Sequence, residues 1–480
     1  MQEKTYSNYI DGQWISNDLY TENFNPSNLD DLIGRYSLAD EQQVNFAIQS
    51  ARNAFPEWSR MGLQARSNIL DRAGNEILQR TEELGYLLSR EEGKSLVEGI
   101  AEVERSGRIF KFFAGEVLRP SGEFVNSVRS MVDVEIRREP VGVIGLITPW
   151  NFPWAIPSWK VAPALAYGNC VVLKPAELVP ASVWELAKIL DRAGIPPGVF
   201  NLVIGSGSVV GEVICNSPHV DAISFTGSQK IGSRIAMAAA SRMAKIQLEM
   251  GGKNPLVILD DARIDLAVNC ALQGSFYSTG QRCTASSRII VTEQIHERFV
   301  EALIDKMKTV RVGDALDRNN QIGPVASSSQ MSQNLEYIQI GINEGAKLAF
   351  GGEVLKRGTE GYFLSPALFT ETHSKMRINR EEIFGPIASI IKVKDYEEAL
   401  SVANDTEFGL CAGIVSDSLK HVSNFKQRAQ TGMVMVNLPT AGVDYHVPFG
   451  GRKASSHGPR EQGHHAQDFY TTTKTSYIST

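Results

Sequence analysis

Short apolar runs alternate with longer segments of helical periodicity between residues 141 and 259. The runs are Val141–Thr148, Cys170–Lys174, Val199–Ile204, Ala222–Thr226 and Pro255–Leu259. Each run is followed by a turn or a helical pattern, which is typical of βαβ units whose parallel strands form one sheet. This alternation predicts an α/β fold and is the strongest constraint on what the chain can form.

The segments on either side continue the α/β pattern. Residues 40–115 are helical in pattern, as in Arg66–Leu88, where apolar side chains recur at helical spacing among charges. Residues 260–435 alternate again, which predicts a second α/β domain. The expected elements there are helices over 262–276 and 295–309 and strands over 287–292 and near 388–393.

Two further segments are expected to be exposed strands. Residues 131–136 alternate strictly between apolar and polar side chains, which predicts a half-exposed strand. Residues 469–478 are rich in β-branched and aromatic side chains and end the chain. A lone terminal strand needs a partner edge, and the strand at 131–136 is the candidate, in the same chain or in another subunit.

Composition narrows the class of protein. The chain has 480 residues, 42% of them hydrophobic, and a net charge of -6, which gives no reason to expect nucleic acid or an anionic membrane as partner. The first residues have no apolar segment typical of a secretory signal, and no run approaches the roughly 20 apolar residues of a membrane helix. Five cysteines without a C-x-x-C pair predict neither a disulfide framework nor a metal site, and favour a cytoplasmic location.

Glycine-rich turns follow two of the expected strands. Gly205–Gly211 resembles a dinucleotide-binding turn, but its third glycine comes one residue too late for G-x-G-x-x-G. Phe225–Gly232 again places glycine between a strand and a helix start. Such turns offer backbone N–H groups to phosphate oxygens, although glycines also serve simple βα turns. Both interpretations stay open from the residues alone.

Two residues are candidates for nucleophilic chemistry. Cys283 lies in a polar, glycine-bearing break, unlike Cys170, which is flanked by apolar strand residues. Arg282 beside it would lower the thiol pKa if its side chain pointed inward. Glu249 ends an apolar strand and precedes two glycines, where α/β enzymes place their sites, and is the candidate base. The alternatives are a buried small cysteine and a solvated loop charge.

Polar residues also end other strands of the first sheet. Asn151, held between prolines and aromatic residues, is suited to donate a hydrogen bond to an oxyanion, or simply caps a turn. Lys174 and Glu177 provide one cation and one anion at the next strand end. They are suited to a nucleotide phosphate and to ribose hydroxyls.

Seven motifs in order carry a family resemblance. They are TPWNFP, KPAE, FTGS, LEMGGKNP, GQRC, EEIFGP and PFGG, spread over nearly the whole chain. The sequence resembles the NAD(P)-dependent aldehyde dehydrogenase superfamily. Within it, the stretches TGQRCTASSRIIV, VNLPTAGVDYHVPFGGRKASS and HGPREQG are most similar to α-ketoglutaric semialdehyde dehydrogenases.

The resemblance implies a role for each catalytic candidate. Cys283 takes the position of the nucleophile that forms a thiohemiacetal and then a thioester. Asn151, with the backbone N–H of Cys283, would hold the oxyanion. Glu249 would activate the water that hydrolyses the thioester, and it must be ionised to do so.

The resemblance also implies cofactor contacts, with NAD+ preferred over NADP+. A carboxylate at Glu177 accepts ribose hydroxyls but repels a 2′-phosphate. Glu382 would bind the nicotinamide ribose, and Phe384 would lie against the ring. The full set of expected contacts is Ile147, Trp150, Lys174, Glu177, Gly207, Phe225, Ser228, Gln330, Glu382 and Phe384.

An aromatic tunnel is expected to take the substrate. Several relatives that oxidise acid semialdehydes carry an arginine where Trp159 stands, so Arg282 or the Arg452–Lys453 loop is the candidate anchor for a carboxylate. α-Ketoglutaric semialdehyde is the expected substrate; the alternatives are aromatic or aliphatic aldehydes, or a non-catalytic crystallin-like relative. The expected substrate contacts are Phe152, Trp154, Trp159, Tyr277, Arg282 and Phe449.

The family architecture implies three parts and a homodimer or homotetramer. A Rossmann-like cofactor domain would comprise 1–118 and 140–251. An α/β catalytic domain would comprise 252–447. A small β oligomerisation element would comprise 119–139 and 461–480.

Overall fold

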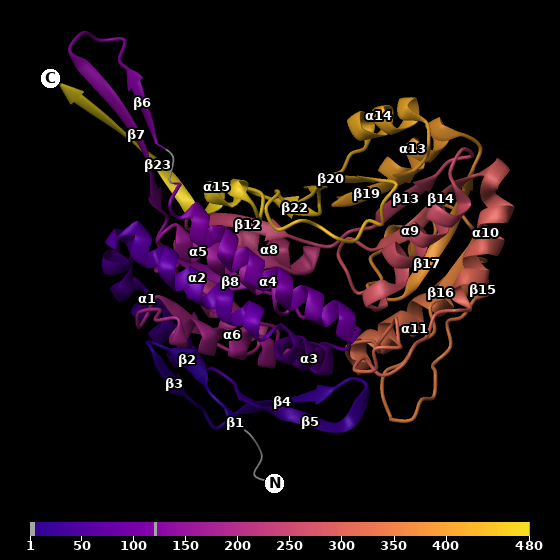
Figure 1. Ribbon diagram of the computed structural model, residues 1–480, viewed down its shortest axis with the longest axis horizontal. Helices are drawn as coiled ribbons and strands as arrows, with labels where there is room; N and C mark the ends of the chain where they lie inside the picture. Colours follow the sequence, from indigo (N-terminus) through magenta and orange to yellow (C-terminus); the bar gives the residue numbers. More distant parts are fainter. Residues whose placement is uncertain (1–4, 120–121, 480) are drawn as a thin grey trace.

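The chain forms two helix-covered β-sheets and a projecting β arm (Figure 1). This computed structural model describes residues 5–119 and 122–479. Residues 1–4 of the expected cofactor domain, and residues 120–121 and 480 of the expected oligomerisation element, lie outside the described residues.

The first sheet has the parallel core that the apolar runs predict. Its five central strands are parallel, and two of them, Cys170–Lys174 and Ala222–Thr226, keep the predicted bounds. In spatial order the sheet contains β22 (Ser456–His457), β12 (Lys245–Glu249), β11 (Ala222–Thr226), β8 (Val143–Ile147), β9 (Cys170–Lys174), β10 (Phe200–Leu202), β2 (Asn8–Ile10) and β3 (Gln13–Ile15).

Helices cover this sheet and bury a large apolar core against it. The first four come from the segment 40–115, whose periodicity predicts helices, and the others follow strands of the sheet. They are α1 (Glu41–Arg60), α2 (Leu63–Gln79), α3 (Thr81–Glu92), α4 (Leu96–Glu116), α5 (Ala155–Ala166), α6 (Pro180–Arg192), the π-helical turn η1 (Gly207–Gly211), α7 (Glu212–Asn216) and α8 (Gln229–Ala240).

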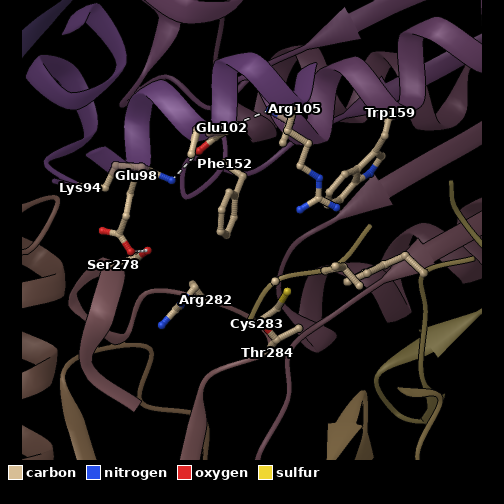
Figure 2. A pocket seen from close by; sticks show the side chains of 15 residues that line it. Lys94, Glu98, Glu102, Arg105, Phe152, Trp159, Ser278, Arg282, Cys283 and Thr284 are labelled. Atoms are coloured by element: carbon tan, nitrogen blue, oxygen red, sulfur yellow. Dashed lines mark hydrogen bonds and ion pairs between the residues drawn. The ribbon is translucent and has the colours of Figure 1, made fainter. Parts of the chain in front are cut away.

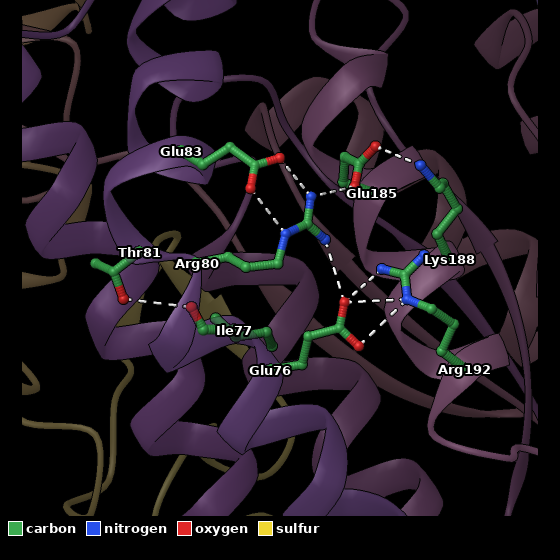
Figure 3. A network of polar contacts seen from close by, with 8 residues as sticks. All are labelled: Glu76, Ile77, Arg80, Thr81, Glu83, Glu185, Lys188 and Arg192. Carbon is green, nitrogen blue, oxygen red and sulfur yellow. Dashed lines mark hydrogen bonds and ion pairs between the residues drawn. The ribbon is translucent and has the colours of Figure 1, made fainter.

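The helical pattern over Arg66–Leu88 is interrupted at Arg80. The Thr81 hydroxyl donates to the carbonyls of Ile77 and Leu78, which satisfies the end of α2 and favours a break there. The Arg80 guanidinium binds three carboxylates from α2, α3 and α6 (Figure 3). This network fixes how the three helices pack.

Four residues separate β12 of the first sheet, which stops at Glu249, from β13 of the second sheet, which begins at Asn254. Its order is β15 (Lys347–Phe350), β16 (Ala367–Thr372), β17 (Ile387–Val393), β14 (Ser286–Thr292), β13 (Asn254–Ile258), β19 (Cys411–Val415) and β20 (Met433–Val436). Its helical elements are α9 (Ile264–Phe276), the 3₁₀ turn η2 (Tyr277–Gly280), α10 (Glu293–Met307), α11 (Ser328–Asn343), α12 (Arg377–Arg380), α13 (Tyr396–Asn404) and α14 (Leu419–Arg428).

The terminal strand pairs within its own chain. β23 (Thr471–Ser479) runs antiparallel to β7 (Val132–Pro140), which also pairs with β6 (Glu123–Asn126). The three strands form the arm that projects from the body in Figure 1. Before β23 the chain forms η3 (His464–Ala466) and α15 (Gln467–Tyr470), so the predicted strand at 469–478 begins two residues later than expected.

Two small sheets complete the fold. β1 (Thr5–Tyr6), β5 (Asn28–Ser37) and β4 (Tyr20–Asn25) form one of them, and β18 (Phe408–Gly409) and β21 (Arg452–Lys453) form the other. Within residues 5–119 and 122–479, none of the helices combines the length and the apolar character needed to cross a membrane.

Candidate active site

Two cavities meet at Cys283. The aromatic cavity, about 200 Å³, has walls that include Phe152, Trp159 and Phe449. The sheet-edge cavity, about 210 Å³, lies beyond the carboxyl ends of β8, β11 and β12. Cys283 lines both cavities. A group at its sulfur is therefore accessible from two sides.

A strained turn holds Cys283 in this position. Ser278 and Thr279 have φ of 51° and 55°, values that non-glycine residues rarely adopt. Gly280 follows at φ 63°, and a Cβ there would lie 2.1 Å from the carbonyl oxygen of Gly385. The turn therefore depends on close packing of the chain, and such strain is common where side chains are positioned for function.

The Cys283 thiol is protonated at neutral pH in this arrangement. Burial raises its pKa to about 12, and the charges of Glu382 and Glu249 act in the same direction. The Arg282 guanidinium donates to the carbonyl of Gln273 and interacts electrostatically with Cys283. The effect of burial on the thiol pKa is larger, so the net shift of this pKa is upward. The thiol must lose its proton to a base before it reacts.

Asn151 lies beside Cys283 in the sheet-edge cavity. Its Nδ2 donates to the carbonyl of Gln281 at 3.0 Å, and its main-chain carbonyl accepts from Lys94 Nζ at 2.7 Å. Lys94 is in turn paired with Glu102 at 2.6 Å. Both ends of Asn151 are thus fixed, and a second N–H of the amide is free to donate to an oxyanion.

Glu249 ends β12 and is buried, yet it lines neither cavity. The Ser456 hydroxyl donates to Oε2 at 2.6 Å, and the Lys160–Glu461 ion pair lies nearby. Burial raises the pKa of the Glu249 carboxyl well above its usual range, and the charge of Glu461 adds to this rise. A base in this position must rotate toward Cys283 and lose its proton before it acts.

Aromatic and polar groups line the sheet-edge cavity. The rings of Trp150 and Phe384 meet edge to face at 5.4 Å. Phe384 has a φ of 60°, and the Gln330 amide donates to its carbonyl at 3.0 Å, which holds this unusual turn. Ser228 also lines the cavity as the cap of α8. Thr226 Oγ1 is buried there without a partner among the described residues, as expected of a ligand contact.

Glu382 is held close to the glycine turn that follows β12. It accepts from the Gly252 N–H at 2.9 Å, and burial raises the pKa of its carboxyl to about 7. A Cβ at Gly251 would lie 2.0 Å from a Glu382 oxygen, so only glycine leaves room for this carboxylate.

The other expected cofactor residues lie along the same sheet edge, outside the cavity lining. Ile147 ends β8 and pairs in register with Lys174, the last residue of β9, and with Phe225 of β11. Gly207 opens η1. Glu177 lies three residues beyond Lys174. The positions form one continuous edge of parallel strand ends, where α/β folds bind nucleotides.

Two expected substrate residues lie outside the aromatic cavity. Phe152, Trp159, Arg282 and Phe449 line it as expected, but Trp154 and Tyr277 do not. Trp154 precedes α5 and is fully buried in the core of the first sheet. Tyr277 packs against the core of the second sheet. Proximity to a motif in the sequence was a poor guide to side-chain direction.

Helix α4 and the residues before it supply charged groups that sequence reasoning missed. These charged residues recur at spacings of three to four residues, so they lie on one side of the helix and face the aromatic cavity (Figure 2). Their spacing in the sequence indicates that they share one face of a helix. Only the packing of α4 against α5 shows that this face borders the cavity. These residues are Lys94, Glu98, Glu102 and Arg105.

This arrangement is typical of an enzyme with a cysteine nucleophile and a nucleotide cofactor. The aldehyde dehydrogenase family model matches residues 14–476. The α-ketoglutaric semialdehyde dehydrogenase of Bacillus subtilis is 42% identical over 99% of both chains. The α-ketoglutarate semialdehyde dehydrogenase of Haloferax volcanii is 41% identical over 98% of both chains.

Solved structures agree with these matches. The betaine aldehyde dehydrogenase of Staphylococcus aureus in complex with NAD+ superposes with a TM-score of 0.96 at 34% identity, covering 99% of this chain and 95% of that one. An NADP-dependent enzyme of E. coli gives 0.96 at 33% identity, covering 99% and 98%. The chain belongs to the aldehyde dehydrogenase family, and the predicted fold class is confirmed.

Proposed function

We propose that the protein oxidises α-ketoglutaric semialdehyde to α-ketoglutarate with NAD+. The observation that supports this most is the position of Cys283, which lines both cavities. An aldehyde in the aromatic cavity and a cofactor in the sheet-edge cavity would meet at Cys283. The substrate is proposed because relatives at 40–42% identity are named for this semialdehyde or for 2,5-dioxopentanoate.

The residues of the chain supply the acid–base chemistry. Cys283, once deprotonated, adds to the aldehyde carbon, and Asn151 with the Cys283 N–H stabilises the resulting oxyanion. Glu249 takes the proton from water, which then hydrolyses the thioester on Cys283. All three residues are present, which argues against a non-catalytic crystallin-like relative.

The sheet-edge cavity fits a nicotinamide dinucleotide. The aromatic walls at Trp150 and Phe384 suit a flat ring, and the unpartnered Thr226 hydroxyl and Glu382 suit polar ligand groups. When bound, the oxidised nicotinamide accepts the hydride that leaves the substrate carbon. Glu177 at the strand edge favours NAD+ over NADP+, because a carboxylate repels a 2′-phosphate.

We also propose a homodimer or homotetramer assembled through the arm. Its strands β6 and β23 are outer edges of a three-stranded sheet, and Phe124, Val128 and Tyr477 on it are exposed. Exposed edges and apolar side chains of this kind are usually covered by another chain. The domain boundaries at 118, 139, 251 and 447 and the cytoplasmic location remain predictions.

The experiment is a steady-state assay of NADH and NADPH formation with four aldehydes. They are α-ketoglutaric semialdehyde, succinic semialdehyde, pentanal and benzaldehyde. We expect the highest kcat/KM with the first and with NAD+. The apolar walls of the aromatic cavity favour the second candidate, a dehydrogenase of aromatic or aliphatic aldehydes. Preference for benzaldehyde or pentanal would select that candidate.

A further inference from the structure

Arg105 brings a positive charge into the wall of the aromatic cavity. It lies on α4 and lines the same cavity as Cys283. Its guanidinium carbon is 5.5 Å from the centre of the Trp159 ring, and Figure 2 shows the two side chains next to each other. The aromatic face fixes the direction of the guanidinium and stabilises its charge.

The hydrogen-bonding capacity of Arg105 is mostly unused. Nη2 donates to Gln462 Oε1 at 3.1 Å. Nε is buried without an acceptor, and Nη1 has no acceptor among the residues that the structure describes. Trp159 Nε1 and Gln462 Nε2 are also buried donors without partners in the described chain. Unpaired buried donors are costly, and Arg105 and Trp159 line the cavity, so this end of the cavity is suited to a ligand with acceptor oxygens.

The two carboxylates that line the cavity, Glu98 and Glu102, already accept hydrogen bonds. Glu102 pairs with Lys94, and its Oε1 accepts from the backbone N–H groups of Trp154 and Ala155. Glu98 accepts from the hydroxyls of Ser95 and Ser278. These carboxylates are therefore not available to neutralise a further cation.

Arg105 itself has no carboxylate within ion-pair distance in the described part of the chain. Glu102 and Asp444 act on it only from farther away. Burial lowers the pKa of its guanidinium to about 10, so it is still positively charged at neutral pH. A buried cation without a partner is unfavourable unless a ligand supplies the opposite charge.

The anchors expected from the sequence are placed differently from Arg105. Arg282 lines the cavity, its Nη2 donates to the carbonyl of Gln273 on α9, and its Nε is buried without a partner in the described chain. Its side chain is directed away from Arg105 and Trp159 (Figure 2). Arg452 and Lys453 lie in the exposed strand β21, and Lys453 Nζ donates to the carbonyls of Asn404 and Thr406. Neither residue lines the cavity.

We infer that Arg105 binds the carboxylate of an aldehyde acid whose aldehyde group lies at Cys283, and that it determines selectivity for such substrates. This inference rests on the proposed function, because it explains how an aromatic cavity accepts an acidic semialdehyde. A guanidinium can donate to the oxygens of a carboxylate from several N–H groups, and Nε and Nη1 of Arg105 have no acceptor among the described residues.

The test compares Arg105→Met with Arg108→Met, a control one turn along α4 whose side chain is exposed and pairs only with Glu104. The substrates are α-ketoglutaric semialdehyde and pentanal, which have the same chain length but differ in charge. We expect Arg105→Met to lower kcat/KM for the semialdehyde about 100-fold, mainly through KM, because a carboxylate is left unpaired. We expect pentanal turnover to be unchanged or improved, and Arg108→Met to resemble the wild type with both.

A fold check keeps the test decisive. Arg105→Lys, which keeps the charge but not the fork, should recover part of the lost selectivity, and all variants should melt within a few degrees of the wild type. If Arg105→Met loses activity equally with both aldehydes, or with neither, Arg105 is not the anchor, although the proposed function stands. If the wild type itself prefers pentanal, the proposed function fails. In that case, the ratio of kcat/KM for succinic semialdehyde to that for butanal is compared between Arg105→Met and the wild type. An unchanged ratio would show that Arg105 does not bind the carboxylate.

Discussion

Two arginine-centred clusters show opposite uses of the same side chain. Arg80 binds Glu76, Glu83 and Glu185 near the surface, where three helices meet (Figure 3). The hydrogen bond to Glu83 is the main cause that raises the pKa of Arg80. Burial instead lowers the pKa of Arg105, which has no carboxylate within ion-pair distance among the residues that the structure describes.

The difference between the two clusters indicates that the first has a structural role and the second a role in substrate binding and catalysis. Around Arg80 the protein supplies both signs of charge, so the cluster is complete without a ligand. Around Arg105 and Cys283, donors and a thiol have no partners in residues 5–119 and 122–479. Removal of a group from the first cluster should therefore affect stability, and removal from the second should affect turnover.

The largest effect is expected from Cys283→Ala. Loss of the nucleophile should lower kcat by about 10⁴-fold or more, because no other group can form the thioester. Cys215→Ala is the control, since Cys215 is buried and lines neither cavity. Steady-state NADH formation measures both variants. Turnover near the wild-type rate in Cys283→Ala would eliminate the assigned nucleophile.

A smaller loss is expected from Glu249→Gln. An amide cannot take the proton from water, so kcat should fall by about 10² to 10⁴-fold, a range typical of general bases. Glu301→Gln, on the exposed side of α10, is the control. Rapid-mixing kinetics should retain an initial burst of NADH in Glu249→Gln. A burst lost together with the steady state would place Glu249 before thioester formation instead.

The pH dependence of kcat should move with the environment of Glu249. Because burial raises its carboxyl pKa, the active, ionised form gains population as pH rises, and kcat should increase with pH. The Ser456 hydrogen bond lowers this pKa, so Ser456→Ala should shift the rising limb to higher pH by about one unit or less. A shift to lower pH would show that another group controls the limb.

The smallest effect is expected from Arg80→Met. Its ion pairs lie near the surface and each contributes little, so the melting temperature should fall by about 1–3 °C with kcat unchanged. Differential scanning fluorimetry and the standard assay measure the two quantities. An unchanged melting temperature with impaired turnover would show that the Arg80 cluster affects catalysis and not stability, contrary to the comparison.

Sequence reasoning located the sheet edge better than the cavity. Strands such as Cys170–Lys174 are continuous apolar runs, so their ends and the polar residues after them were predictable. The role of Cys283 required the family resemblance, because its surroundings alone also fit a buried thiol. Long-range pairs were beyond reach: Lys160 and Glu461 meet across 301 positions, and no local pattern marks such a contact.

Trp154 and Arg105 show two ways in which the sequence fails to predict side-chain direction. Trp154 stands next to a catalytic motif but is buried in the core because of where α5 begins. Arg105 stands in a helix without a motif, and the packing of α4 brings it to the cavity. Side-chain direction depends on tertiary packing, which the sequence pattern does not encode locally.

We propose that one thiol, Cys283, forms the covalent intermediate between the two cavities and that Glu249 is needed to release it. Peptide mass spectrometry of Glu249→Gln, quenched in acid after mixing with NAD+ and α-ketoglutaric semialdehyde, tests both roles. We expect an acyl group of the substrate's mass, less one hydrogen, on the peptide that contains Cys283. An acyl group on another cysteine, or none while NADH is formed in the burst, would contradict it.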